Sequence, residues 1–271
     1  MSAYFRVSSK HTAAHYDIWM DNFLGLQDHM VIFTSEDMLG KIELTRAHAL
    51  DRTVVIIMEL EDVPLASLYN ISFWEDQMER DAEKDLHKSY KLFWIWLSKT
   101  YWVHEAVRMN FFNSDIFMWC DFGSFRQFSW PYHGKTLIRH HEMVPVDKVL
   151  QMAFNHPTPL PGGKLLDDKF KYSDNFYHSG MHSIAYAHTW KRFYPFFLDT
   201  IDKFLELGIV LCDDQVVLQG CCTLHPELCA YVLPEEAPHD RRFRALRYVL
   251  HFGGSYNYWT PPNISDHPLI N

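Results

Sequence analysis

Two uninterrupted apolar runs near the N-terminus constrain the fold most strongly. Met30–Thr34 (MVIFT) and Thr53–Met58 (TVVIIM) are bounded by polar residues and contain many β-branched side chains. Runs of this kind fit strands that are buried on both faces, as in parallel sheets covered by helices. Ala3–Val7 is a further β-prone run. We therefore expect an α/β fold with a mostly parallel sheet.

Helical patterns alternate with these strands. An apolar stripe predicts a helix that Gly25 can end, and a long helical segment is predicted over Asp81–Arg108. Asp115–Cys120 has the pattern of another strand and leads directly into Asp121. Alternating strands and helices imply right-handed crossovers and a doubly wound sheet, in which ligands bind outside the carboxyl ends of the strands. Asp121 is expected at such an end.

The second half of the chain is less regular. An amphipathic helix is predicted over Trp190–Leu207, with Gly208 as its stop and Pro195 in its first turn or at a kink. His156–Gly163 is rich in proline and glycine and must be a loop. Tyr248–Gly254 is interpreted as an apolar strand that ends in two glycines.

The charge balance bears on the partners. The chain has 34 acidic and 25 basic residues, a formal net charge of -9. It therefore lacks the basic footprint of non-specific nucleic-acid binding, and we expect no nucleic-acid partner. A phosphate-bearing ligand would have to be met by local charge, from a bound metal or from a few lysines and arginines.

Targeting and redox signals are weak. No stretch reaches the roughly 18 apolar residues of a membrane span, and no signal peptide is recognisable, so a cytoplasmic location is expected. A chain trimmed of an anchor, working in the Golgi or ER lumen, would look the same. The five cysteines contain no CxxC pair, and we expect them to be mostly buried thiols.

The stretch Asp121-Phe122-Gly123 carries the clearest chemical signal. A carboxylate at a strand end, followed by a glycine that permits close backbone approach, suits an oxygen-ligated Mg²⁺ or Mn²⁺ that bridges phosphates. The alternative is an ordinary aspartate that caps backbone amides in a turn.

A family resemblance appears at the same stretch. The run Ile116–Arg126 looks like the central motif of the HtrL/YibB family, which is grouped with glycosyltransferases of the GT-A type. Ala3–His11, Val31–Thr34, Trp94–Lys99 and Asp214-Gln215 resemble further motifs of that family in the same order. The resemblance spans roughly residues 3–250. It implies a GT-A-like, Rossmann-type sheet, mostly parallel and flanked by helices.

The resemblance also implies a metal site. GT-A enzymes commonly carry Asp-x-Asp, and the equivalent triplet here is Trp119-Cys120-Asp121. Asp121 would correspond to the last, metal-binding aspartate, which leaves the metal one ligand short. His251 resembles the late histidine that such enzymes supply to the metal; the alternative is a core or capping histidine. A mixed Asp and His site favours Mn²⁺ over Mg²⁺.

Several basic residues are candidates for contacts with the donor. Lys10, Lys99 and Arg126 could meet the phosphates or the nucleotide. Lys99 interrupts an apolar helix face, so its amine must reach either solvent or a partner. Gly180, within His178–His182, resembles the small-residue loop that GT-A enzymes place under the donor sugar.

An acidic pair is the candidate for acid/base chemistry. Asp214, followed by Gln215, resembles the late Asp-Gln pair of many glycosyltransferases, and Asp214 would take the proton of the acceptor hydroxyl. Asp213 is then a helix cap, and the alternative is that both aspartates are caps. Four further histidines lack metal-ligand spacing and are expected at the surface: His140, His141, His182 and His188.

Together these features predict one domain over residues 1–271. Residues 1–126 form its nucleotide-sugar-binding half, and residues 127–271 form the acceptor side with a C-terminal tail. The expected activity is a metal-dependent transfer of a monosaccharide from a nucleotide-diphosphate sugar, with UDP favoured, to a hydroxyl of a glycan, protein or small molecule. Two alternatives stay open, a non-catalytic nucleotide-sugar or glycan-binding protein and a metal-dependent hydrolase with a compact His/Asp cluster.

Overall fold

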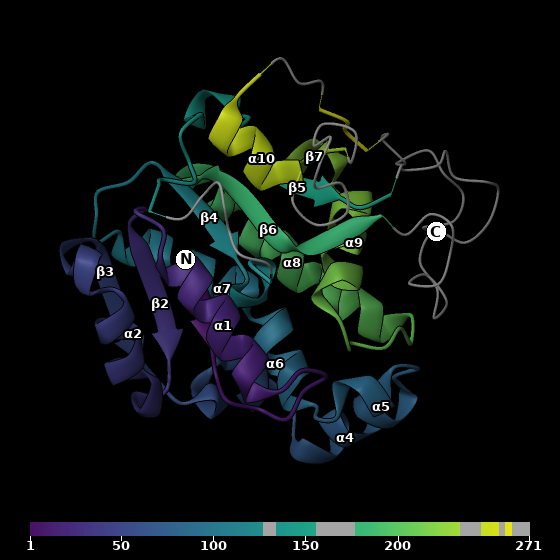
Figure 1. Cartoon of the computed structure of the whole chain (residues 1–271). Helices are drawn as coiled ribbons and strands as arrows, with labels where there is room; N and C mark the ends of the chain where they lie inside the picture. Colours follow the sequence, from purple (N-terminus) through teal and green to yellow (C-terminus); the bar gives the residue numbers. More distant parts are fainter. Residues whose placement is uncertain (127–133, 156–176, 234–244, 255–257, 262–271) are drawn as a thin grey trace.

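The structure, a computed structural model, describes residues 1–126, 134–155, 177–233, 245–254 and 258–261 (Figure 1). Its first sheet has three parallel strands in the order β1-β2-β3. Their bounds are Ser2–Tyr4 for β1, Met30–Thr34 for β2 and Thr53–Ile57 for β3. The two apolar runs thus form neighbouring parallel strands, as expected.

A second sheet has four strands in the order β4-β6-β5-β7. Their bounds are Ile116–Cys120 for β4, Val149–Ala153 for β5, His178–Tyr186 for β6 and Cys229–Val232 for β7. Strand β6 is antiparallel to both β4 and β5, whereas β5 and β7 are parallel. The α/β class is therefore confirmed, but only the first sheet is wholly parallel and the second is mixed.

Met1 joins the two sheets. Its backbone oxygen accepts a hydrogen bond from Cys120 N at 3.0 Å, and its nitrogen donates to Met118 O at 2.6 Å. In a pair of parallel strands, a residue forms hydrogen bonds with the residues just before and just after the one opposite it, and Met1 has this pattern. The carboxyl ends of β1, β2, β3 and β4 consequently lie at one edge. In doubly wound sheets, ligands bind outside this edge.

Helices cover both faces of the sheets (Figure 1). Alternate residues of β4 point to opposite faces: Phe117 and Trp119 join one apolar core, and Met118 and Cys120 join the other. The first core also contains buried side chains of α6 to α9, and the second contains those of α1, α2 and α10. The helices are α1 (Ala13–Leu24), α2 (Leu39–Thr45), α3 (Pro64–Leu68), α4 (Ile71–Arg80), α5 (Lys84–His87), α6 (Lys91–Leu97), α7 (Lys99–Met109), α8 (Ala187–Glu206), α9 (Asp214–Leu224) and α10 (Ala245–Phe252).

The long helix expected over Asp81–Arg108 is divided into α5, α6 and α7. Lys88 ends α5 in the left-handed region with φ 65°, and Ser98 separates α6 from α7 with φ -89° and ψ 2°. Neither break contains glycine or proline, so the usual breaker signals are missing from the sequence. The second break makes Lys99 the first residue of α7.

Two other expected helices form. Helix α1 precedes Gly25, and α8 is followed by Gly208 at φ 71°, a backbone conformation that glycine adopts without strain. Pro195 lies in the interior of α8 and not in its first turn. The expected loop at His156–Gly163 lies outside the described residues.

The expected strand at Tyr248–Gly254 is wrong. This segment forms most of α10, whose buried apolar residues Ala245, Leu246, Val249 and Leu250 fall on one helical face. A short apolar run cannot by its periodicity alone separate a strand from a buried helix, and here tertiary packing selects the helix.

The expectation of buried thiols is wrong for two cysteines. Cys222, near the end of α9, forms a disulfide with Cys229 at the start of β7. The other three cysteines are buried thiols. Within the described part of the chain, no helix is long and apolar enough to cross a membrane.

Candidate functional site

A cavity of about 380 Å³ lies where the carboxyl ends of β1 and β4 meet the first turns of α7 and α9. Its wall contains Lys10, Lys99, Asp121, Gly180 and Asp214, together with Arg126 and Gln215. Seven of the eight residues expected at the site from the sequence are therefore brought to one cavity, and His251 is not among its lining residues.

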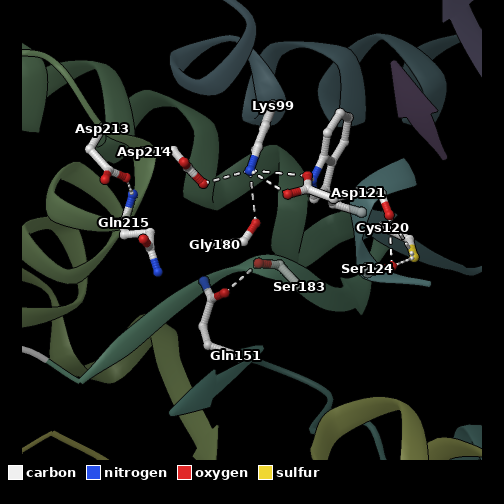
Figure 2. A network of polar contacts seen from close by, with 11 residues as sticks. Lys99, Cys120, Asp121, Ser124, Gln151, Gly180, Ser183, Asp213, Asp214 and Gln215 are labelled. Atoms are coloured by element: carbon white, nitrogen blue, oxygen red, sulfur yellow. Dashed lines mark hydrogen bonds and ion pairs between the residues drawn. The ribbon is translucent and has the colours of Figure 1, made fainter. Parts of the chain in front are cut away.

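The ammonium of Lys99, a residue of the cavity wall, is the centre of a network of polar contacts (Figure 2). Its Nζ lies 2.8 Å from Asp214 Oδ2, 3.0 Å from Asp121 Oδ1 and 3.0 Å from the backbone oxygen of Gly180. The Lys99 side chain is only 6% exposed. Its amine therefore contacts carboxylates inside the protein and not bulk solvent. Of the two possibilities expected from the sequence, solvent or a partner, the structure shows a partner.

Asp121 stands directly after β4, as expected, and is held by its neighbours. Trp119 Nε1 donates to its Oδ1 at 2.7 Å, while Ser124 Oγ donates to its backbone oxygen at 2.7 Å. Its amide donates to Met181 O at 3.0 Å, which fixes the strand end beside β6. The indole of Trp119 thus orients the carboxylate of Asp121.

Asp213 and Asp214 have separate tasks at the start of α9. Asp213 is the N-cap, and its side chain accepts from Gln215 N at 2.8 Å, as the sequence indicated. Asp214 points toward Lys99, and Gly180 packs directly against it: a Cβ at Gly180 would lie 2.0 Å from Asp214 Oδ2. Only glycine fits there. Gly180 lies within strand β6 and not in the expected loop.

Charge and burial shift the pKa values of the central pair. Burial raises the pKa of Asp214 to about 7, and the nearby carboxylates of Asp213 and Asp121 add to this, while Lys99 opposes it. Burial by itself lowers the pKa of Lys99, but the carboxylates of Asp121 and Asp214 outweigh burial and raise it. The two carboxylates therefore favour the charged form of Lys99.

Two buried polar pairs connect the strands of the second sheet, and the sequence did not indicate them. Ser183 Oγ of β6 donates to Gln151 Oε1 of β5 (Figure 2), and His178 Nδ1 lies 2.9 Å from the hydroxyl of Tyr231 in β7. Burial and the charge of Lys99 lower the pKa of His178 to about 3. The lowered pKa favours the neutral imidazole, and its hydrogen bond connects the start of β6 to β7.

One end of the cavity is cationic and aromatic. Arg126 places its guanidinium over the ring of Trp19 at 4.9 Å and donates from Nε to Gly123 O at 3.0 Å. Lys10 and Tyr16 line the same part of the wall, and Lys10 is exposed. Lys10 and Arg126 are therefore free to approach an anion that enters from solvent.

Another part of the wall comes from α5 and α6, and α5 lies apart from α1 in Figure 1. His87 is buried and its Nδ1 is hydrogen-bonded to the carboxylate of Asp81, whose side chain is fully buried. Glu83 lies with its Oε2 3.8 Å from His87 Nε2, and Trp96 packs its edge against the imidazole ring. No sequence spacing pointed to this Asp–His pair, because it depends on the turn that follows α4.

His251 lies elsewhere. It belongs to α10 on the opposite face from α7 and α9, and its Nδ1 is 2.9 Å from Thr136 O. Burial lowers the pKa of this histidine. The expected convergence of His251 with Asp121 is not seen, because the segment is a helix rather than a strand end. His182 is fully buried and so differs from the surface position expected for it, whereas His188 is exposed.

The oxygens that a metal would use near Asp121 are those that Lys99 holds. Asp121, Asp214 and Gly180 O all contact its Nζ. The described ranges contain no group of three or more His, Cys, Asp or Glu side chains that could hold a metal ion, which also leaves the hydrolase alternative without its His/Asp cluster. The donor set is thus arranged around an ammonium and does not fit a divalent metal while Lys99 stays in place.

Comparison with known proteins gives a family but no activity. Residues 6–245 match the family described as "Bacterial protein of unknown function (HtrL_YibB)". The chain belongs to the HtrL/YibB family. No curated protein and no solved structure matches it.

Proposed function

We propose that this protein binds a nucleotide-diphosphate sugar, with UDP as the favoured nucleotide, and transfers the sugar to a hydroxyl acceptor. The observation that carries the proposal is the cavity at the carboxyl edge of the parallel strands, with Lys99, Asp121 and Asp214 on its wall. Ligands of open α/β sheets bind at this edge. The GT-A resemblance of the Asp121 and Asp214 motifs supports the choice of reaction.

The cationic end suits the nucleotide diphosphate. Lys10, Arg126 and Tyr16 line this end, and the ring of Trp19 packs against the guanidinium of Arg126. Positive charge and aromatic rings therefore occur side by side. A diphosphate needs such cationic donors, and a planar base can stack on an aromatic ring.

The end formed by α5 and α6 suits the acceptor. Glu83 offers a carboxylate that accepts hydrogen bonds from sugar hydroxyls, and Trp96 offers an apolar ring face. This end has no lysine or arginine among its lining residues from α5 and α6, so it is a poor place for a second phosphate. A neutral, hydroxyl-bearing acceptor fits it better.

In the proposed reaction the bond between the anomeric carbon and the diphosphate oxygen breaks, and a bond from that carbon to the acceptor oxygen forms. The electron pair leaves with the diphosphate, and the acceptor proton passes to a base on the protein. Asp214 and His87 are the two candidates for that base. Asp214 has a pKa near neutrality but is engaged by Lys99, whereas His87 is oriented by Asp81, as a general base requires.

Binding of nucleotide-sugars tests this function. We expect calorimetry or thermal shift to detect at least one of UDP-, GDP- or CDP-sugar, and Arg126→Ala to weaken its binding by about tenfold or more, the loss typical of a charge-assisted hydrogen bond. Arg108→Ala is the matched control, because Arg108 is exposed and pairs only with Glu105 among the contacts that the structure describes. Failure of every nucleotide-sugar to bind would contradict the proposal.

A non-catalytic nucleotide-sugar-binding protein is the second candidate. Lys99 engages Asp214, the base expected from the sequence, and this favours a site that holds ligand without using that carboxylate. Release of nucleoside diphosphate from a bound donor, with and without acceptor sugars, separates the two candidates. Tight binding without turnover supports the second.

A further inference from the structure

Lys99 is surrounded by oxygens in the way that a bound cation would be. Its three N–H donors face three groups from three separate elements: Asp121 after β4, Asp214 at the start of α9 and the backbone oxygen of Gly180 in β6. The distances of 2.8–3.0 Å are those of charge-assisted hydrogen bonds. An ammonium has three donors and no acceptor, so this arrangement uses its full capacity.

Both carboxylates are also held by neighbouring residues. Trp119 Nε1 holds Asp121 Oδ1, and the indole ring of Trp119 lies 5.8 Å from Lys99 Nζ. Gly180 packs against the carboxylate of Asp214 with no space for a Cβ. A cage held in this manner is preorganised, and it does not depend on a ligand to bring its members together.

We propose that Lys99 is the resident cation of this site and stands where a divalent metal would otherwise bind. Carboxylate and carbonyl oxygens are the ligands that Mg²⁺ and Mn²⁺ prefer, and Lys99 already occupies all three. A metal ion placed among them would lie within a few ångströms of the ammonium and would be repelled by it. The site therefore excludes divalent metal for as long as Lys99 is present.

One consequence rests on the proposed function. If a nucleotide diphosphate binds in the cavity, Lys10 and Arg126 meet its charge without a metal. Binding of the nucleotide then proceeds equally well in EDTA and in Mn²⁺. The exclusion of metal by Lys99 stands independently of this consequence, because it concerns the protein alone.

The decisive experiment uses Mn²⁺ as the only probe. Wild-type protein, freed of metal with EDTA and dialysed, is titrated with MnCl₂, and binding is followed by electron paramagnetic resonance of free Mn²⁺ and by thermal shift. We expect the wild type to bind no Mn²⁺ at this site, so that wild type and Asp121→Asn give the same titration. Lys99→Ala vacates the cage, so we expect this variant to bind Mn²⁺ at least about tenfold more tightly than wild type and to gain melting temperature as Mn²⁺ is added.

Two controls make the result specific. Lys99→Ala combined with Asp214→Asn should lose the acquired Mn²⁺ binding, and Lys91→Ala, which removes an exposed lysine paired with Glu61, should not acquire any. Mn²⁺ binding by the wild type that disappears in Asp121→Asn would overturn the proposal, and this comparison decides it even if Lys99→Ala does not fold. Such a result would leave glycosyl transfer intact as a function, whereas failure of all nucleotide-sugars to bind would reject that function and leave the Mn²⁺ result standing.

Discussion

Removal of the Lys99 ammonium should destabilise the protein through the carboxylate that it leaves behind. Lys99 and Asp214 have side chains that are 6% and 5% exposed, and their charged atoms are 2.8 Å apart. Breaking a buried ion pair by removing one partner typically costs about 3–5 kcal/mol, since the other charge stays buried. We expect Lys99→Met to lower the free energy of unfolding by up to this amount, because the pKa of Asp214 rises further without Lys99 and its carboxyl group can take up a proton.

A double-mutant cycle shows whether the cost comes from Asp214. Asp121 keeps its hydrogen bond from Trp119 and is 26% exposed, so it tolerates the loss of Lys99 better than Asp214 does. In the double variant Lys99→Met/Asp214→Asn the buried charge is gone, and we expect it to recover about 2 kcal/mol of the loss. Urea unfolding followed by circular dichroism measures all four proteins. If the costs of the two single substitutions sum to the cost of the double variant within about 0.5 kcal/mol, the two residues are not coupled and the reasoning is refuted.

The same cycle has a pH dependence with a defined sign. The pKa of Asp214 is already raised to about 7 from its ordinary 3.8, and Lys99 opposes that shift. A carboxyl group with a raised pKa in the folded state contributes stability at low pH, and this contribution is lost as the pH rises through the raised value. The deficit of Lys99→Met should therefore shrink as the pH falls from about 8 to about 5. Lys84→Met is the matched control, because among the described contacts the Lys84 ammonium forms only an exposed pair with Glu79, and its loss should change the stability far less.

Three further outcomes are expected. Gly180→Ala should cost about 1–3 kcal/mol through overpacking against Asp214, whereas Gly40→Ala, in α2 with open space around it, should stabilise by about 0.5–1 kcal/mol; equal effects in urea unfolding would contradict the steric argument. The pKa of His178 is lowered from 6.5 to about 3, so this group contributes stability above pH 6.5 that is lost as the pH falls toward 3. At about pH 5 the wild type should have lost about 2 kcal/mol of its free energy of unfolding through this group, and His178→Asn should not show this loss. The denatured chain should react with a thiol reagent at three cysteines before reduction and at five after it, and reduction should lower the free energy of unfolding by about 2 kcal/mol; five reactive thiols at the outset would show that the Cys222–Cys229 disulfide does not form.

The strand ends were the most predictable part of the site. The apolar run before Asp121 and the acidic pair before α9 are local signals, and both residues reach the cavity as expected. The ion pair between Lys99 and Asp214 was not predictable. It joins residues 115 positions apart, and such a contact depends on how the helices pack and not on any spacing in the sequence.

The prediction for His251 failed at the level of secondary structure. The run before Gly253 is apolar but short, and its period does not distinguish a strand from a helix that is buried on one side. Once the segment is a helix on the opposite face, His251 cannot follow a strand to the edge where Asp121 lies. The Asp81–His87 pair was missed for a related reason, because it forms across a turn that no glycine or proline marks.

The break between α6 and α7 connects the fold to the chemistry. A continuous helix would place Lys99 in a helix interior, whereas the break at Ser98 makes it the first residue of α7, beside the ends of the strands. A cation at a helix N-terminus is disfavoured by the helix dipole, by about 0.3–1 kcal/mol. The attraction of two buried carboxylates outweighs this cost, as the raised pKa of Lys99 indicates. Lys99 is thus held against the local preference of its own helix by the two carboxylates that it contacts, and the stability of α7 does not explain its place.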